Sequence, residues 1–150
     1  MRVMTVLAGL TSAGLLAGCA ATAPAQTAAA DVAPGGAKAS AIEVCMPGGE
    51  RQYLSMLVCA GGQRPTFHRT GSVGERHPLP AGLTDKQLSA QLDRSLRGAP
   101  LEPGEVDAHV VDAYEVSCGE VKRQVFMDMY HCPQPAATVA PAGFSLRPRD

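Results

Sequence analysis

Two segments of the sequence, 43–59 and 115–132, each contain two cysteines at the same spacing, and this constrains the fold more than any other feature. An aromatic residue and a methionine also fall at matching positions when the cysteines are aligned, so we interpret the segments as an internal repeat. An even number of such cysteines in an exported chain is typical of disulfides. The four cysteines are Cys45, Cys59, Cys118 and Cys132.

Each repeat is expected to form a strand, a turn and a second strand. Pro47-Gly48-Gly49 favours a turn in the first copy, and Gly119-Glu120 favours one in the second. In such a hairpin Cys118 lies at the turn and Cys132 at the far end, roughly 30 Å away at about 3.4 Å per residue. Disulfide partners need Cα atoms within about 7 Å. We therefore favour bridges between the repeats, and the sequence leaves open which of the two crossed pairings forms.

One helix is predicted over residues 84–97. Thr84 and Gln87 have the spacing of a capping box, and Gly98 supplies a stop signal. Leucines recur every fourth residue between them, which gives one apolar stripe that we expect to pack on the sheet. These leucines are Leu88, Leu92 and Leu96.

The fold class predicted from these elements is α+β: a small antiparallel sheet of two related hairpins, packed by one helix and stapled by disulfides. The chain has no tryptophan, three phenylalanines and three tyrosines, so its core is small and needs the bridges. We expect one folded domain over residues 42–134. Residues 19–41 are rich in alanine, proline and glycine and predict a disordered tether, and the proline-rich segment 135–150 predicts a disordered tail.

The start of the chain has the pattern of a secretory signal peptide. Arg2 precedes an uncharged apolar stretch that runs to Ala17, and at about 15 residues this stretch is too short for a membrane span. Leu16-Ala17-Gly18-Cys19 then resembles the lipobox of bacterial lipoproteins. The resemblance implies a signal peptide over residues 1–18, cleavage before Cys19, and attachment of a lipid to the Cys19 sulfur.

The same resemblance gives an expected location. Ala20 follows the cysteine, where an aspartate usually signals retention in the inner membrane, so the implied location is the outer membrane of a cell envelope. The repeat region resembles small uncharacterised envelope lipoproteins of proteobacteria, a resemblance that carries no known activity. The implied partners are the membrane, through the lipid anchor, and an envelope protein or cell-wall component.

Composition and motifs argue against several kinds of chemistry. A net charge of −1 is unlike the strong basic excess of nucleic-acid-binding proteins. The sequence has no Cys-x-x-Cys or His-x-x-x-His spacing, and oxidised cysteines do not ligate metal, so we expect no metal site and no cofactor. Ser72 stands between glycines, but in the wrong register for a hydrolase nucleophile, so no catalytic residue is assigned.

The segment 63–77 is the one candidate for ligand binding that the sequence offers. Arg64, Arg69 and Arg76 make it basic, and we expect a loop that binds an anionic partner. The alternative is that it pairs within the fold with segment 102–120, which contains six acidic residues and no lysine or arginine.

These observations leave three function classes in order of preference. The first is a non-enzymatic envelope module that binds or supports another component while tethered. The second is a small periplasmic hydrolase or redox enzyme, which requires a cleft joining histidine, aspartate or serine side chains from separate segments. The third is a disulfide-stapled inhibitor, for which segment 63–77 is the only candidate loop.

Overall fold

The computed structural model describes residues 33–132 and 134–148 of the chain. The expected signal peptide, Cys19 and most of the expected tether lie outside the described residues. Within the described part, no helix is long and apolar enough to cross a membrane.

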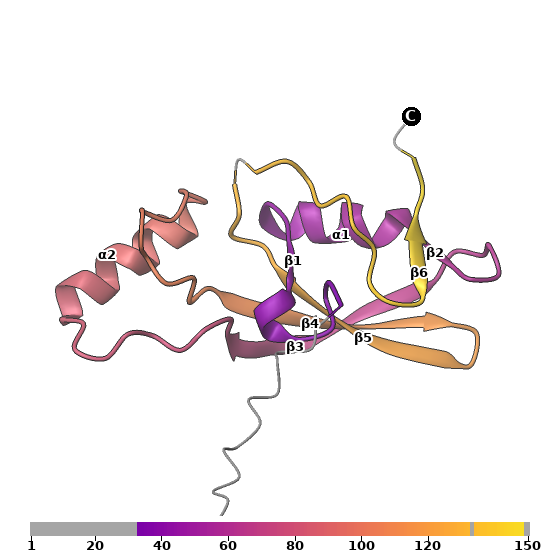
Figure 1. Ribbon diagram of the computed structural model, residues 1–150, viewed down its shortest axis with the longest axis horizontal. Helices are drawn as coiled ribbons and strands as arrows, with labels where there is room; N and C mark the ends of the chain where they lie inside the picture. The colour runs from indigo at the N-terminus through magenta and orange to yellow at the C-terminus, as the bar shows by residue number, and fades with distance from the viewer. Residues whose placement is uncertain (1–32, 133, 149–150) are drawn as a thin grey trace, which may run out of the picture. The chain divides into compact units, whose positions relative to one another are not determined.

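A four-stranded sheet forms the centre of the fold, in the order β1-β5-β4-β3 (Figure 1). Strands β3 (Thr66–Glu75), β4 (Val110–Cys118) and β5 (Val121–Asp128) are antiparallel neighbours, and the short β1 (Ile42–Glu43) is parallel to β5. The turn between β4 and β5 contains Gly119 at φ 61°, a conformation that favours glycine. The hairpin predicted for the second repeat is therefore confirmed, and β1 makes the sheet mixed.

The first repeat is not a hairpin, and its prediction was wrong. Its first residue, Glu43, ends β1, residues Met46–Met56 form helix α1, and Leu57–Cys59 form the short strand β2. Pro47 lies in the first turn of α1, where its missing N–H costs nothing. The Pro-Gly-Gly signal was thus the start of a helix.

Burial explains why this segment is helical despite two glycines, each of which costs about 1 kcal/mol in a helix. Tyr53, Leu54 and Leu57 are almost completely buried and pack against β4 and β5 as part of the main core. The hydroxyl of Tyr114 in β4 donates a hydrogen bond of 2.9 Å to the buried carboxylate of Glu50 in α1. The fold is therefore α+β as predicted, with two α-helices among the described residues where one was expected.

The predicted disordered tail is also wrong for the residues that the structure describes. Phe144–Leu146 form strand β6, which pairs antiparallel with β2. The hydroxyl of Tyr53 donates to the carbonyl of Val139 at 2.6 Å, and Phe144 and Leu146 pack against the core. Among the described residues β2 pairs with no other strand, so the C-terminal segment completes that side of the core.

The end of the expected tether belongs to the fold as well. A short 3-10 helix, η1, spans Lys38–Ser40. The amide of Phe126 donates to the carbonyl of Gly35 at 2.9 Å, which attaches the segment to β5. The folded part therefore begins before residue 42, where we had expected it to start.

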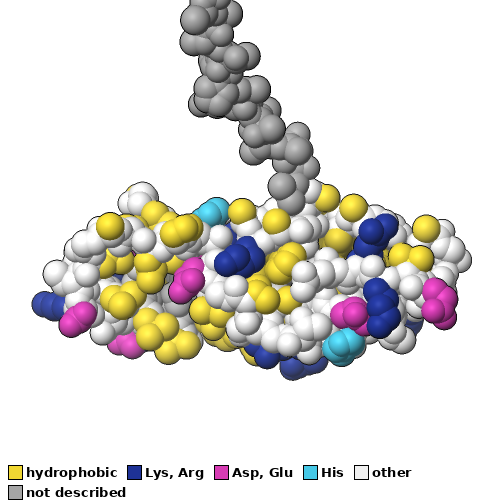
Figure 2. Space-filling view, turned by 90° about the horizontal axis from the view of Figure 1, so that it is seen from below, with side chains coloured by type: hydrophobic (Ala, Val, Ile, Leu, Met, Phe, Trp, Pro, Cys, Tyr) yellow, Lys and Arg dark blue, Asp and Glu magenta, His cyan; other side chains and the backbone are white. Residues whose placement is uncertain are grey.

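Helix α2 spans Asp85–Leu96 and has the capping box expected of Thr84 and Gln87. Its apolar stripe, however, does not pack on the sheet as predicted, because Leu92 is 57% exposed and Leu96 is 60% exposed. The helix instead bonds to the loop that follows it, through Arg94 and Glu105. Hydrophobic side chains gather at the end of the molecule that carries α2 (Figure 2).

Both disulfides join one repeat to the other, as the spacing argument favoured. Cys45 is bonded to Cys132 with Cα atoms 4.9 Å apart, and Cys59 is bonded to Cys118 with Cα atoms 5.9 Å apart. The two bridges therefore hold opposite ends of the β4–β5 hairpin to the first repeat.

Two leucine substitutions test this division into core and exposed helix. Leu54→Ala removes a fully buried side chain and is expected to lower the free energy of unfolding by about 2–5 kcal/mol. Leu92→Ala, the matched control in α2, is expected to change it by less than about 0.5 kcal/mol. Urea denaturation measures both free energies of unfolding. Equal losses in the two variants would show that the leucine stripe of α2 is packed on the sheet.

Candidate functional site

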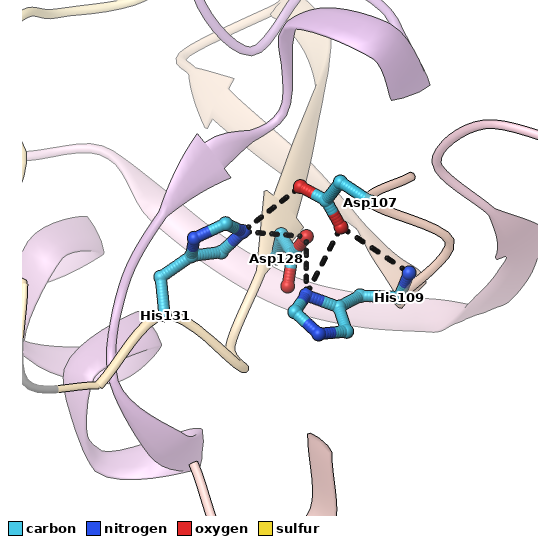
Figure 3. A group of neighbouring side chains, drawn as sticks. All are labelled: Asp107, His109, Asp128 and His131. Carbon is cyan, nitrogen blue, oxygen red and sulfur yellow. Dashed lines mark hydrogen bonds and ion pairs between the residues drawn. The ribbon is translucent and has the colours of Figure 1, made fainter. Parts of the chain in front are cut away.

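A cluster of two histidines and two aspartates lies where several strands meet at one end of the four-stranded sheet. Asp107 and His109 immediately precede β4, Asp128 is the last residue of β5, and His131 follows it. Figure 3 shows the four side chains pointing toward one another from these segments. We call this group the His–Asp cluster.

The polar atoms of the His–Asp cluster lie within hydrogen-bond or ion-pair distance. Nε2 of His131 is 3.1 Å from Oδ2 of Asp107 and 3.0 Å from Oδ2 of Asp128. Nδ1 of His109 is 3.0 Å from Oδ1 of Asp107 and 3.4 Å from Oδ2 of Asp128. Each histidine therefore contacts both carboxylates.

Arg76, directly after β3, contributes a permanent positive charge to the edge of the cluster. Its Nη1 atom lies 2.9 Å from Oδ2 of Asp107 and 3.6 Å from Oδ2 of Asp128. The same atom is 2.7 Å from Oε1 of Glu43 at the end of β1. Glu43 is the most exposed of these groups, so the charges run from a buried centre toward solvent.

Burial and charge together set the ionisation of the cluster. Burial raises the pKa of Asp128, but its contacts with His109 and His131 lower it by more. The net result is a pKa of about 2. Burial lowers the pKa of each histidine, but the two carboxylates raise both pKa values to about 9. The same contacts hold the pKa of Asp107 well below its usual range. Without a ligand, both histidines are therefore protonated and both aspartates ionised at neutral pH.

One polar atom of the cluster lacks a well-directed partner. The side chain of His109 is only 3% exposed, and its Nδ1 atom makes no hydrogen bond of acceptable geometry to any residue that the structure describes. The carboxylate oxygens of Asp107 and Asp128 are close to this atom but out of line with its N–H direction.

Two hollows reach the cluster from different sides. One, of about 280 Å³, is lined by His131, Asp107 and Glu43 together with Tyr130 and His109. The other, of about 230 Å³, is mostly apolar and lies between α2 and the sheet; His109 and Tyr130 line it too. His109 thus separates a polar approach to the cluster from an apolar one.

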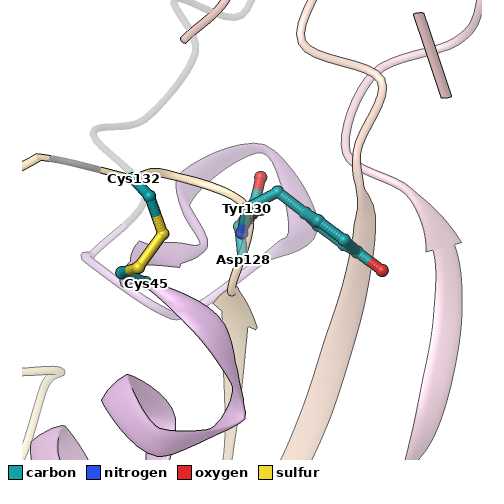
Figure 4. Close-up of a disulfide and its surroundings, with 4 residues drawn as sticks. All are labelled: Cys45, Asp128, Tyr130 and Cys132. Carbon is teal, nitrogen blue, oxygen red and sulfur yellow. Dashed lines mark hydrogen bonds between the residues drawn. A yellow bond between two sulfur atoms is a disulfide. The ribbon is translucent and has the colours of Figure 1, made fainter. Parts of the chain in front are cut away.

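The Cys45–Cys132 disulfide fixes the segment that carries His131. Figure 4 shows the bridge with Tyr130 and Asp128 beside it. Cys45 forms an isolated β-bridge with Tyr130, and the amide of His131 donates to the carbonyl of Val44 at 3.1 Å. The position of His131 is therefore set by covalent and backbone bonds to the first repeat.

The three arginines of the predicted anion-binding loop do not form one surface. Segment 63–77 is largely strand β3, in which Arg69 binds Asp112 through two contacts of 2.6 Å. Arg76 points into the His–Asp cluster, and Arg64 is exposed before β3 begins. The alternative, pairing of the basic segment with the acidic one, is what the structure contains.

Our sequence analysis missed the His–Asp cluster because no short motif connects its members. The signal that could have found it is the register of the second repeat. A tight turn at Gly119-Glu120 pairs Asp112 with Met127, and extending that register places His109 opposite Tyr130. The rings of His109 and Tyr130 are indeed 5.2 Å apart.

The cluster has the composition of a site for a cation or for protons. Each of its four residues offers one ligand atom, and these atoms all lie within 4.8 Å of one another. Imidazole and carboxylate groups also exchange protons near neutral pH.

Comparison with known proteins adds no candidate function, because no protein family, curated protein or solved structure matches the chain.

The ionisation of the cluster predicts how stability depends on pH. A histidine pKa raised from 6.5 to about 9 by folding stabilises the protein fully below pH 6.5 and loses that contribution as pH rises through 9. With EDTA present, the free energy of unfolding should fall between pH 6.5 and 9.5, by up to about 3 kcal/mol per histidine.

Urea denaturation across this pH range measures the effect. His131→Gln should flatten the dependence, whereas the matched control His68→Gln, an exposed residue of β3, should leave it unchanged. A flat profile in the unmodified protein would contradict this account of the charges.

Proposed function

We propose that the chain is an exported, lipid-anchored protein of the cell envelope whose folded domain is a non-enzymatic binding module. Cys19 carries the lipid, the membrane is the outer membrane, and the His–Asp cluster is the binding site. An envelope protein or a cell-wall component is the expected neighbour of the tethered domain.

The observation that carries the proposal is the pair of disulfides between distant segments. Cys45–Cys132 and Cys59–Cys118 use every cysteine except Cys19. Disulfides persist in oxidising compartments and are rare in the cytosol. This supports export, and it leaves a single thiol, at the position that resembles a lipobox, for attachment of the lipid.

The cluster supports binding more than catalysis. Its histidines are held protonated by the aspartates, so neither is available as a general base at neutral pH. The hydroxyl of Ser72, the serine with a superficial resemblance to a hydrolase motif, donates to Asp112 away from the histidines. A histidine of the cluster would have to separate from its aspartate partners before it could act as a base.

A small hydrolase or redox enzyme is the second candidate, and one observation favours it. The cluster joins histidine and aspartate side chains from separate segments beside a hollow, which is the arrangement that this class requires. Turnover of simple ester or amide substrates by the purified protein, lost in His131→Gln, would establish it. The inhibitor class loses its candidate loop, because segment 63–77 is mostly a paired strand.

Labelling with a palmitate analogue tests the anchor. Cells expressing the full chain should attach the label to the protein, and Cys19→Ser should abolish labelling. The matched control, Cys59→Ser with Cys118→Ser, should still be labelled because those sulfurs are used in a bridge. An unlabelled wild-type protein, or one recovered from the cytosol with free thiols, would overturn the proposal.

Crosslinking in intact cells tests the binding module. The wild-type protein should recover a specific envelope neighbour, identified by mass spectrometry. A variant that retains residues 1–32 but lacks the folded part should not recover it. Recovery of the same neighbour by both proteins would place the interaction in the anchor and contradict a role for the domain.

A further inference from the structure

We propose that the His–Asp cluster binds one divalent transition-metal ion, with Asp107, His109, Asp128 and His131 as its four ligands. This inference rests on the proposed function, since it takes the cluster as the binding site and names the ligand. Zinc is the ion whose usual geometry and donor set fit most closely.

The spacing of the ligand atoms matches a tetrahedral ion. Zinc bonds of about 2.0–2.1 Å to nitrogen and oxygen place neighbouring ligand atoms about 3.3–3.4 Å apart. The four histidine-to-aspartate distances in the cluster are 3.0, 3.0, 3.1 and 3.4 Å. These four distances are close to those of a tetrahedral shell, although they use both oxygens of Asp107. One ligand atom from each residue lies within 4.8 Å of the others, so the side chains would have to draw closer together around an ion.

The charges match a divalent ion as well. Two ionised aspartates carry two negative charges in a site where Asp128 is fully buried and Asp107 is 14% exposed. A divalent cation would displace one proton from each imidazole to solvent and would then balance the two carboxylates in place of the two protons. Imidazole with carboxylate is a donor set typical of zinc, whereas calcium and magnesium prefer oxygen ligands alone.

A buried nitrogen without a hydrogen-bond partner points to the same ligand. Nδ1 of His109 faces both carboxylates, and the dashed lines in Figure 3 mark its ion pairs with them. It makes no hydrogen bond of acceptable geometry within the described part of the chain. An ion at the centre of the cluster would displace the proton of this nitrogen to solvent and accept its lone pair. The misaligned donor would in this way become a ligand.

Backbone amides already orient the two carboxylates. Oδ1 of Asp128 accepts from the amide of Tyr130 at 3.1 Å, and Oδ1 of Asp107 accepts from the amide of His109 at 3.3 Å. On the other side of His131, Oε2 of Glu43 lies 3.6 Å from Nδ1. A carboxylate behind a ligating histidine is a common outer partner in metal sites.

Arg76 is the group that must move when an ion binds. Its guanidinium lies 3.2 Å from Nε2 of His131 and competes with a metal for the two carboxylates. It also binds Glu43 and the carbonyl of Ala39, both outside the cluster. These partners allow Arg76 to turn outward and keep its charge paired when an ion enters.

Zinc titration of the exported full chain, stripped with EDTA, tests the proposal. Calorimetry at pH 7 should give one zinc per chain, with a dissociation constant below about 1 µM. His109→Gln should weaken binding at least about 100-fold, since losing even an outer partner of a ligand typically costs 10- to 100-fold. The matched control His68→Gln, on the exposed strand β3, should bind as the wild type does.

A second measurement does not depend on variants folding. Cobalt added to the stripped wild-type protein should give the strong visible absorbance of a tetrahedral site, and zinc should displace it. Zinc uptake that is unaffected by His109→Gln, or cobalt absorbance as weak as that of the ion in water, would overturn the assignment. Lost zinc binding with palmitate labelling intact would overturn the metal alone, whereas unlabelled protein that binds zinc would overturn only the anchor.

Discussion

A carboxylate that is completely removed from water must be matched by positive charge, and Asp128 imposes that requirement on the fold. It ends the central strand β5 with its side chain fully buried. His109, His131 and Arg76 all lie within 3.6 Å of its Oδ2 atom, and they come from three different parts of the chain. Breaking one partner from a buried pair typically costs about 3–5 kcal/mol, so these segments are held together at this end of the sheet.

The disulfides hold in place the segments that carry the charged side chains. Cys118 at the turn of the β4–β5 hairpin is bonded to Cys59, and Cys132 beyond its other end is bonded to Cys45. The hairpin is thus fixed to the first repeat at both ends, and His131 stands next to one of the bridges. A cluster built in this way keeps its geometry without a large core.

Local signals predicted the elements that depend on local interactions. The capping box of Thr84 and Gln87 located α2, and the turn at Gly119 located the β4–β5 hairpin. These local signals gave wrong predictions where contacts between distant residues determine the secondary structure. Pro47 with two glycines resembles a turn until the burial of Tyr53 and Leu54 makes it a helix, and residues after 134 look disordered until β6 pairs with β2.

The same difference between local and distant contacts explains why the His–Asp cluster was not predicted from the sequence. Cysteine spacing favoured bridges between the repeats, because a residue at the turn of a hairpin cannot reach one at its open end. The leucine stripe of α2 indicated a buried face, but a periodic pattern does not say what covers it, and Leu92 is exposed. The His–Asp cluster needed both the register of one hairpin and the strand order of the sheet, and only the hairpin register was within reach of the sequence.

Nuclear magnetic resonance of the imidazole nitrogens tests most directly whether these four side chains form one binding site. In the stripped protein at neutral pH, both nitrogens of His109 and of His131 should be protonated. Zinc should convert Nδ1 of His109 and Nε2 of His131 to metal-bound nitrogens and leave one proton on each ring, while His68 and His77 stay unchanged. Spectra of His109 and His131 that do not change with zinc would contradict the account.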